Sequence, residues 1–272
     1  MKLTKFTVLL LLTCFLLGSS AVESQVKTKS SVLKRPPGFL IEFNLSYSQP
    51  LPNMMGEIGE QFNFKNYGVK TGVGSQLYFK LVTDKKGKLR PFLTIGYDLF
   101  LNSNKTTAYI PNNITTHWPN DTAATGTVGG NSKMYLHDFS FGAGFEYAFV
   151  NKTTWTPYAN FDFTMNMIFG TYKQTPSSTG LEVSYTYKNA TRLGIGVGFG
   201  VNGRFTKSFG ISIGAKWRMP NLLLKDSKLS QEVNKFYIND KEDASLSKNL
   251  TKDRNMMYLQ LYVGAAFYIG RK

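Results

Sequence analysis

The segment from Arg192 to Trp217 constrains the fold more than any other part of the sequence. From Arg192 to Asn202, apolar residues alternate with glycine or polar residues, and after a break at 206–208 the alternation resumes. Because successive side chains of a β-strand point to opposite faces, each run predicts a strand with one apolar face. Two such runs around a tight turn indicate a β-hairpin. Each run has about ten residues, roughly the length that a tilted strand needs to cross a bilayer.

The same alternation recurs in six further segments, 38–47, 67–81, 89–101, 134–149, 155–169 and 257–269. Short connections alternate along the chain with long ones at 48–66, 102–133, 170–190 and 220–254. Short turns at one end and long loops at the other are typical of outer-membrane barrels. The sequence therefore predicts an all-β fold, an eight-stranded antiparallel up-and-down transmembrane β-barrel with short periplasmic turns and long extracellular loops.

The start of the chain predicts export. Lys2 and Lys5 precede an apolar stretch at 6–17, and small residues follow as far as Ala21. This order indicates a secretory signal peptide over 1–21, with a buried helix as the alternative. A flexible periplasmic lead-in over 22–37 and a barrel domain over 38–272 would follow. The single cysteine, Cys14, lies in the signal peptide, so the mature chain has no disulfide, and we expect it in the bacterial outer membrane.

Alternation alone leaves open whether the apolar face contacts lipid or forms the core of a soluble, lipocalin-like barrel. Rows of glycine weaken a strand on a wet surface, whereas a narrow eight-stranded lumen has little room for side chains. We therefore expect the glycine and polar face inside. Buried charges need partners, which predicts ion pairs in the lumen. The charged residues expected there are Glu42, Lys70, Arg90, Asp98, Glu146, Asp162, Arg192, Arg204 and Arg218.

Aromatic residues of the apolar face gather near both strand ends. Two such bands are what the girdles at the two membrane interfaces require. Near the short turns we expect Phe39, Phe79, Phe149, Trp155, Phe209 and Phe267. Near the long loops we expect Tyr47, Tyr67, Tyr135, Phe169 and Trp217.

The last strand contains Gly264 and then alternating bulky residues up to Ile269. In this strand and in its architecture, nearly all of the mature chain resembles the eight-stranded outer-membrane β-barrel proteins of the OmpA/OmpX type. The resemblance implies insertion by the barrel-assembly machinery. The family usually ends on an aromatic residue, whereas here Gly270, Arg271 and Lys272 follow.

The chain has 32 Lys and Arg against 17 Asp and Glu, and the basic residues are scattered through turns and loops. Scattered charge favours contact with anionic headgroups of outer-membrane lipid, and no nucleic-acid partner is expected. His117 and His137 have neither a Ser-His-Asp arrangement nor a two-His metal spacing. We therefore predict no enzyme activity, no cofactor and no metal.

The sequence is compatible with three roles. We expect a non-enzymatic structural role in envelope integrity or surface adhesion, because loops on a rigid barrel can supply contacts to an extracellular surface. The alternative is a narrow channel or uptake protein for a small apolar molecule. In the fourth loop, Leu229, Val233 and Phe236 are spaced for one face of a short helix. That helix and the first-loop residues Met54, Met55, Ile58 and Phe62 would form its lid. A soluble lipocalin-like binding barrel is the third interpretation.

Overall fold

The computed structural model describes residues 37–62, 64–84, 86–111, 125–149, 154–228, 232, 234–246 and 250–270. The predicted signal peptide and residues 22–36 of the predicted lead-in lie outside these ranges. The long strands are β1 (Phe39–Pro50), β2 (Thr71–Leu81), β3 (Leu89–Asn104), β5 (Thr125–Ala148), β6 (Trp155–Pro176), β7 (Val183–Arg204), β8 (Phe209–Leu223) and β10 (Tyr258–Ile269). The shorter elements are α2 (Ile58–Phe62), β4 (Thr107–Pro111) and β9 (Lys235–Phe236). None of the helices in these ranges has the length and apolar character needed to cross a membrane.

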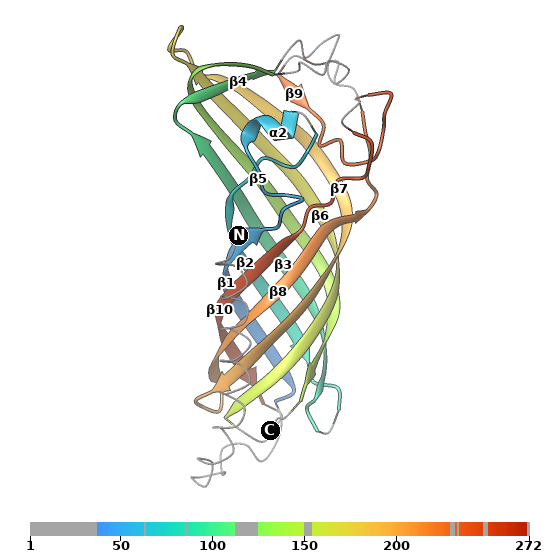
Figure 1. Cartoon of the computed structure of the whole chain (residues 1–272). Helices are drawn as coiled ribbons and strands as arrows, with labels where there is room; N and C mark the ends of the chain where they lie inside the picture. The colour runs from blue at the N-terminus through green and yellow to red at the C-terminus, as the bar shows by residue number, and fades with distance from the viewer. Residues whose placement is uncertain are drawn as a thin grey trace, which may run out of the picture.

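The eight long strands form a closed ring. Each pairs antiparallel with the long strand before it and the long strand after it, and β1 closes the ring by pairing with β10. The strand ends that the short connections join, from β2 to β3, from β5 to β6 and from β7 to β8, lie together at one end of the ring (Figure 1). The predicted eight-stranded antiparallel up-and-down barrel is confirmed.

The wall is much taller on one side than on the other. Strands β5, β6 and β7 have 24, 22 and 22 residues, whereas β1 and β10 have 12 each. Figure 1 shows β5, β6 and β7 rising above the ends of the shorter strands. The predicted loops 102–133 and 170–190 are therefore too long. Much of each belongs to the wall, and β4 continues the edge of β3 by pairing with β5.

The apolar face changes sides in this upper part of the wall. At membrane level the inward residues of β6 are polar, as Asp162 and Asn166 are, and both are fully buried. Higher on β6 and β7 the inward residues are tyrosines, among them Tyr172, Tyr185 and Tyr187. Water in place of lipid outside the upper wall accounts for this exchange, because apolar groups then gain by facing inward.

Two long connections fill the space beside the tall wall, and we call the described residues of 51–70 and 224–257 the cap. Helix α2 packs Phe62 against Tyr172 of β6, with ring centroids 4.9 Å apart, and against Phe236 at 5.7 Å. The helix predicted around Phe236 is wrong for this residue, since β9 pairs in parallel with β7 there. The other two residues that predicted this helix, Leu229 and Val233, lie outside the described residues. The cap and the inner face of the upper wall thus share one apolar core, to which the wall contributes residues such as Phe100 and Ile168.

Candidate functional site

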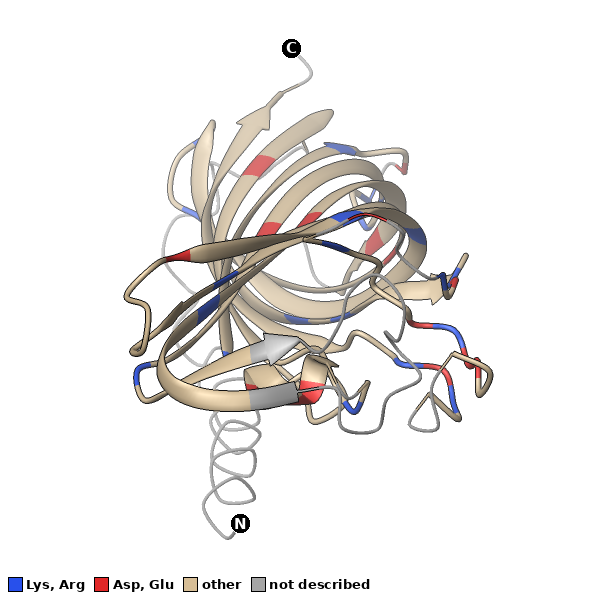
Figure 2. Ribbon diagram, turned by 90° about the horizontal axis from the view of Figure 1, so that it is seen from above, with Lys and Arg blue, Asp and Glu red and all other residues tan. Residues whose placement is uncertain are grey.

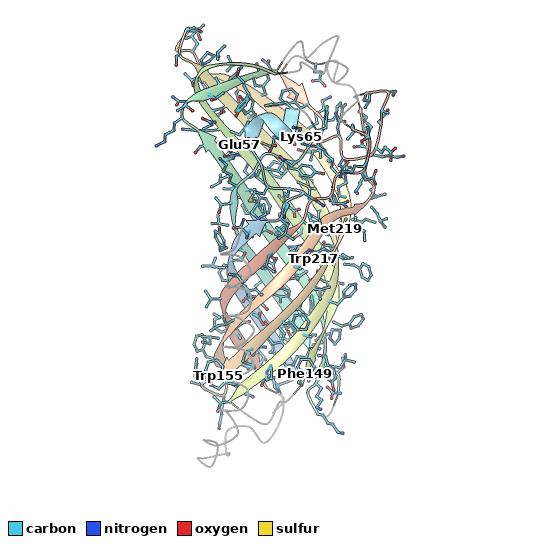
Figure 3. All side chains as sticks on the ribbon, viewed as in Figure 1. Glu57, Lys65, Phe149, Trp155, Trp217 and Met219 are labelled. Atoms are coloured by element: carbon cyan, nitrogen blue, oxygen red, sulfur yellow. The ribbon has the colours of Figure 1, made fainter. Side chains whose placement is uncertain are left out.

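The outer wall of the ring is apolar. Large apolar side chains project from every wall strand, and Phe163 and Phe145 leave 63% and 60% of their surface exposed. Phe149 and Trp155 lie at the short-turn end, whereas Trp217 and Met219 lie near mid-height (Figure 3). An exposed apolar belt on a closed ring of strands is the surface that a bilayer requires. The soluble lipocalin-like interpretation is wrong, because its apolar residues would face inward.

The lowest level of the interior is a buried ion-pair network, and Figure 2 shows acidic and basic segments distributed around the ring. Lys80 Nζ lies 2.5 Å from carboxylate oxygens of both Glu42 and Glu146. Arg90 Nη1 lies 2.8 Å from the other oxygen of Glu146. Ser212 Oγ donates a 2.8 Å hydrogen bond to Glu42. Charges of both signs from four neighbouring strands therefore meet in the lumen.

The middle level joins strands on opposite sides of the ring. Lys216 of β8 forms an ion pair with Asp162 of β6 and donates to the Tyr78 hydroxyl of β2 at 3.0 Å. Tyr78 in turn donates to Gln76, and Gln76 Nε2 donates to Gln260 Oε1 at 2.9 Å. The lumen is crossed by side chains at this height.

The upper level contains two carboxylates that face each other. Asp98 of β3 and Asp138 of β5 are direct cross-strand partners, and the Tyr258 hydroxyl lies 3.0 Å from one and 3.2 Å from the other. Gln260 Nε2 donates to Asp98 at 2.8 Å. Arg218 Nη1 lies 3.7 Å from Asp98 and supplies positive charge to the level.

Arg254 joins the two connections of the cap. Its guanidinium donates to Gln61 Oε1 at 3.1 Å, to the carbonyl of Asn66 at 2.7 Å, and to the carbonyl of Ile238. The same group lies 4.5 Å from the centre of the Tyr67 ring. Burial lowers the pKa of Arg254 and raises the pKa of the Tyr67 hydroxyl. A single buried side chain thus holds the first and fourth connections together.

Arg192 fixes the fourth connection to the wall. It donates two 2.9 Å hydrogen bonds to the two carboxylate oxygens of Asp240 and one of 2.5 Å to Asp226. Asn221 Nδ2 donates to Asp240 Oδ2 at 2.9 Å. Burial raises the pKa of Asp226, but hydrogen bonds and charge from Lys228 and Arg192 outweigh it, and the net pKa is lowered. Asp226 and Asp240 are therefore held against the middle of β7, at Arg192.

Comparison with solved structures finds other barrels. Neisserial surface protein A (NspA) has a TM-score of 0.42 and 14% identity, covering 85% of this chain and 97% of that one. Ail, the attachment invasion locus protein of Yersinia pestis, has a TM-score of 0.36 and 10% identity, covering 86% and 98%. The outer membrane protease OmpT from Escherichia coli has a TM-score of 0.39 and 8% identity, covering 89% and 100%. No protein-family model matches the sequence, and no curated protein does.

The closed ring, the apolar outer wall and the charged interior together decide the class of fold. Lipid can cover the belt, whereas water cannot do so without a large cost in free energy. The chain is an eight-stranded β-barrel of the bacterial outer membrane. Its long connections lie at the extracellular end and its short turns at the periplasmic end.

Most of the charged residues predicted for the lumen lie inside the barrel, namely Glu42, Arg90, Asp98, Glu146, Asp162 and Arg218. Arg192 is buried above them, under the cap. Arg204 is half-buried at the periplasmic end, where it donates to the carbonyls of Thr206 and Lys207. Lys70 is wrongly predicted, because it is exposed and pairs with Glu57 at 2.9 Å.

Tyr67 is the one residue wrongly predicted for the aromatic girdle. It is buried in the cap, because β2 begins at Thr71 and the chain turns at Gly68, which has a φ of +64°. The turn also places Lys70 outside the lumen. The other predicted girdle residues lie on the outer face, within or next to the wall strands, namely Phe39, Tyr47, Phe79, Tyr135, Phe149, Trp155, Phe169, Phe209, Trp217 and Phe267.

The sequence prediction missed Lys80, Asp138 and Lys216, which are buried in the lumen. The alternation of their strands already places all three on the polar face, so the signal was present. It also missed Asp240 and Arg254, which come from the fourth connection and have no strand periodicity around them. Their position depends on the tertiary packing of the cap.

The glycine row of β7 makes room for polar side chains of β6. Asp162 and Asn160 are the cross-strand partners of Gly196 and Gly198. A Cβ atom on Gly196 would lie 2.5 Å from Asp162 Oδ1, and one on Gly198 would lie 2.6 Å from Asn160 Oδ1. Side chains of β6 thus occupy the space beside the glycines of β7, and they fill the lumen along these two strands.

Proposed function

We propose that this protein is a closed, non-enzymatic barrel that presents its folded cap as an adhesive surface outside the cell. The observation that carries the proposal is the filled interior. Buried side chains cross the lumen at each level, from the Glu42, Lys80 and Glu146 network up to Arg254 in the cap. An eight-stranded barrel of this kind has little room left for a channel.

The cap supports adhesion because its long connections are folded. Met54, Ile58 and Phe62 are almost fully buried, and Arg192 and Arg254 tie both connections to each other and to the wall. A surface that is already ordered loses less conformational entropy when it binds a partner. The same packing disfavours the uptake alternative. Three of the four first-loop residues predicted for the lid, Met54, Ile58 and Phe62, are core residues. The lumen beneath them is charged, which disfavours passage of an apolar molecule.

Conductance of the purified full chain in planar bilayers tests whether the barrel is closed. We expect no steady current steps from this chain. As a positive control, a porin with an open lumen should conduct ions in the same bilayer. Reproducible conductance of the wild-type chain, or a flux that depends on an apolar solute, would contradict the closed-barrel proposal.

Adhesion is tested separately with cells of a non-adherent strain that display the full chain. Phe62→Ala should remove most of the adhesion, because it disturbs the packing of the cap. The barrel of this variant should still be folded, so heated and unheated samples should migrate differently on a heat-modifiability gel. The matched control is Phe163→Ala, which shortens an equally large side chain on the lipid face. Equal adhesion by the two variants would argue against the cap as the adhesive surface and leave a role in envelope integrity.

A further inference from the structure

The outer face of β5 and β6 changes its chemistry with height. Cross-strand pairs on this face run from Phe139 and Met167, both exposed, to His137 and Phe169, whose rings stack 4.8 Å apart at 7°. Two positions higher on each strand the face becomes polar. The apolar belt therefore ends just above the His137 and Phe169 stack, where lipid headgroups are expected.

Two lysines face each other above this boundary. Lys133 of β5 and Lys173 of β6 are direct cross-strand partners on the outer face. Like charges in this arrangement are destabilising unless an anion compensates them. Lys173 Nζ lies 2.8 Å from Glu182, but within the described ranges no carboxylate lies at ion-pair distance from Lys133. The pair thus has one more positive than negative charge.

Hydroxyl groups lie between the lysines and the apolar belt. Tyr135 and Thr171 are the next cross-strand pair below the lysines on the same face, and Thr186 of β7 is the partner of Thr171. All three are partly or fully exposed on the outer wall. Ammonium and hydroxyl groups are hydrogen-bond donors, and a phosphate oxygen accepts hydrogen bonds from both kinds of group.

We propose that Lys133 and Lys173 bind the phosphate headgroup of an outer-leaflet lipid, whose acyl chains lie along the apolar wall below. Charge complementarity supports an anion at this pair, and its height at the upper end of the belt supports a lipid as the carrier of the phosphate. Glu182 competes with the phosphate for Lys173. This inference depends on the membrane position of the wall and is independent of adhesion by the cap.

The test is titration of the detergent-solubilised full chain with diphosphorylated lipid A. The double variant Lys133→Gln, Lys173→Gln should weaken binding on the order of tenfold or more, because two ammonium groups near the headgroup are lost. The matched control, Lys228→Gln with Lys235→Gln, removes two exposed lysines of the cap and should leave binding unchanged. A heat-modifiability gel verifies that each variant is folded.

The variant Glu182→Gln should change the affinity for lipid A in the opposite direction. Because it removes the competing carboxylate, it should tighten binding of lipid A several-fold, whereas a purely structural ion pair would give no such gain. Dephosphorylated lipid A should bind the wild-type chain as weakly as lipid A binds the double variant. Unchanged binding by the double variant, weaker binding by Glu182→Gln, or equal competition by inorganic phosphate would overturn the proposal.

Discussion

At the scale of single residues, position decides what a charge does in this barrel. Lys80 and Lys70 lie at opposite ends of the β2 region. Lys80 is 1% exposed between two buried glutamates, whereas the side chain of Lys70 is 49% exposed beside Glu57. A buried charge that loses its partner has to remain unsolvated, whereas an exposed one is simply hydrated. The two lysines should therefore respond very differently to the same substitution.

Lys80→Met should destabilise the barrel by about 3–5 kcal/mol, because Glu42 and Glu146 lose their shared partner while they stay buried. Urea unfolding of the barrel in lipid vesicles measures this change. Lys70→Met is the control and should cost less than about 1 kcal/mol, since it breaks one exposed ion pair. Equal costs for the two variants would show that Lys80 does not lie inside.

A second residue-scale prediction concerns the glycines of the lumen. Gly214→Ala should cost about 1–3 kcal/mol, because its Cβ would collide with the carbonyl of Phe199 and the hydroxyl of Tyr262. Gly270→Ala should be nearly neutral, because nothing lies within 4 Å of a Cβ atom there. The unfolding midpoints of the two variants in urea provide the comparison, and a tolerated Gly214→Ala would contradict a filled lumen.

At the scale of elements, the strands above the membrane protect their unpaired edges with side chains. Among the strands that the structure describes, β4 pairs only with β5, yet the Tyr172 hydroxyl bonds both the N–H and the carbonyl of Tyr109, at 3.0 and 2.7 Å. Asn104 accepts from the N–H of Thr107, and Ser132 donates to its carbonyl. Above the end of β8, β9 covers part of β7. Such capping prevents pairing with strands of other molecules.

The sequence predicts the membrane part of each strand better than the part above it. Within the bilayer the wall has lipid outside, so alternation between residues such as Phe163 and Asp162 identifies strand and face together. Above it, Tyr185 and Tyr187 still alternate with polar residues, but the apolar face is inward. The polar composition there resembles a loop, which is why the prediction ended β6 too early and began β7 too late.

The fourth connection should loosen in acid. The pKa of Asp226 is lowered in the folded chain, because hydrogen bonds and charge from Lys228 and Arg192 outweigh the effect of burial. A lowered carboxylate pKa contributes stability that is fully present above the unfolded value of about 3.8–3.9 and is lost as pH falls through the folded value. The contact between Arg192 and Asp226 should therefore hold the fourth connection against the wall at neutral pH, and it should be lost below pH of about 4.

Hydrogen exchange of the described residues between 224 and 246, followed against pH, measures this release. Asp226→Asn is the matched variant, because it keeps the size of the side chain and removes its charge. It should exchange faster at neutral pH and show a smaller change on acidification. A variant with the same pH dependence as the wild type would exclude Asp226 as the titrating group.

At the scale of the whole molecule, the barrel consists of two stacked cores of opposite polarity. In the membrane, charged and polar side chains lie inside an apolar wall, whereas above it an apolar cluster lies between the cap and the inner face of the upper wall. The surrounding solvent changes from lipid to water along the axis, and the interior changes with it. Since the two cores are held by different interactions, each can lose stability without the other.

Phe62→Ala tests this separation, because Phe62 is 1% exposed in the apolar core and contacts both β6 and β9. The cavity should cost the cap about 3–5 kcal/mol of local stability. Hydrogen exchange should speed up by at least about a hundredfold in residues 51–62 and 234–246, while the membrane-level amides of β1 and β10 keep their protection. Phe163→Ala should leave the cap unchanged, since that side chain contacts lipid. Equal loss of protection in both cores would mean that cap and barrel unfold as a single unit, and the adhesive surface could then not be altered without disturbing the membrane part.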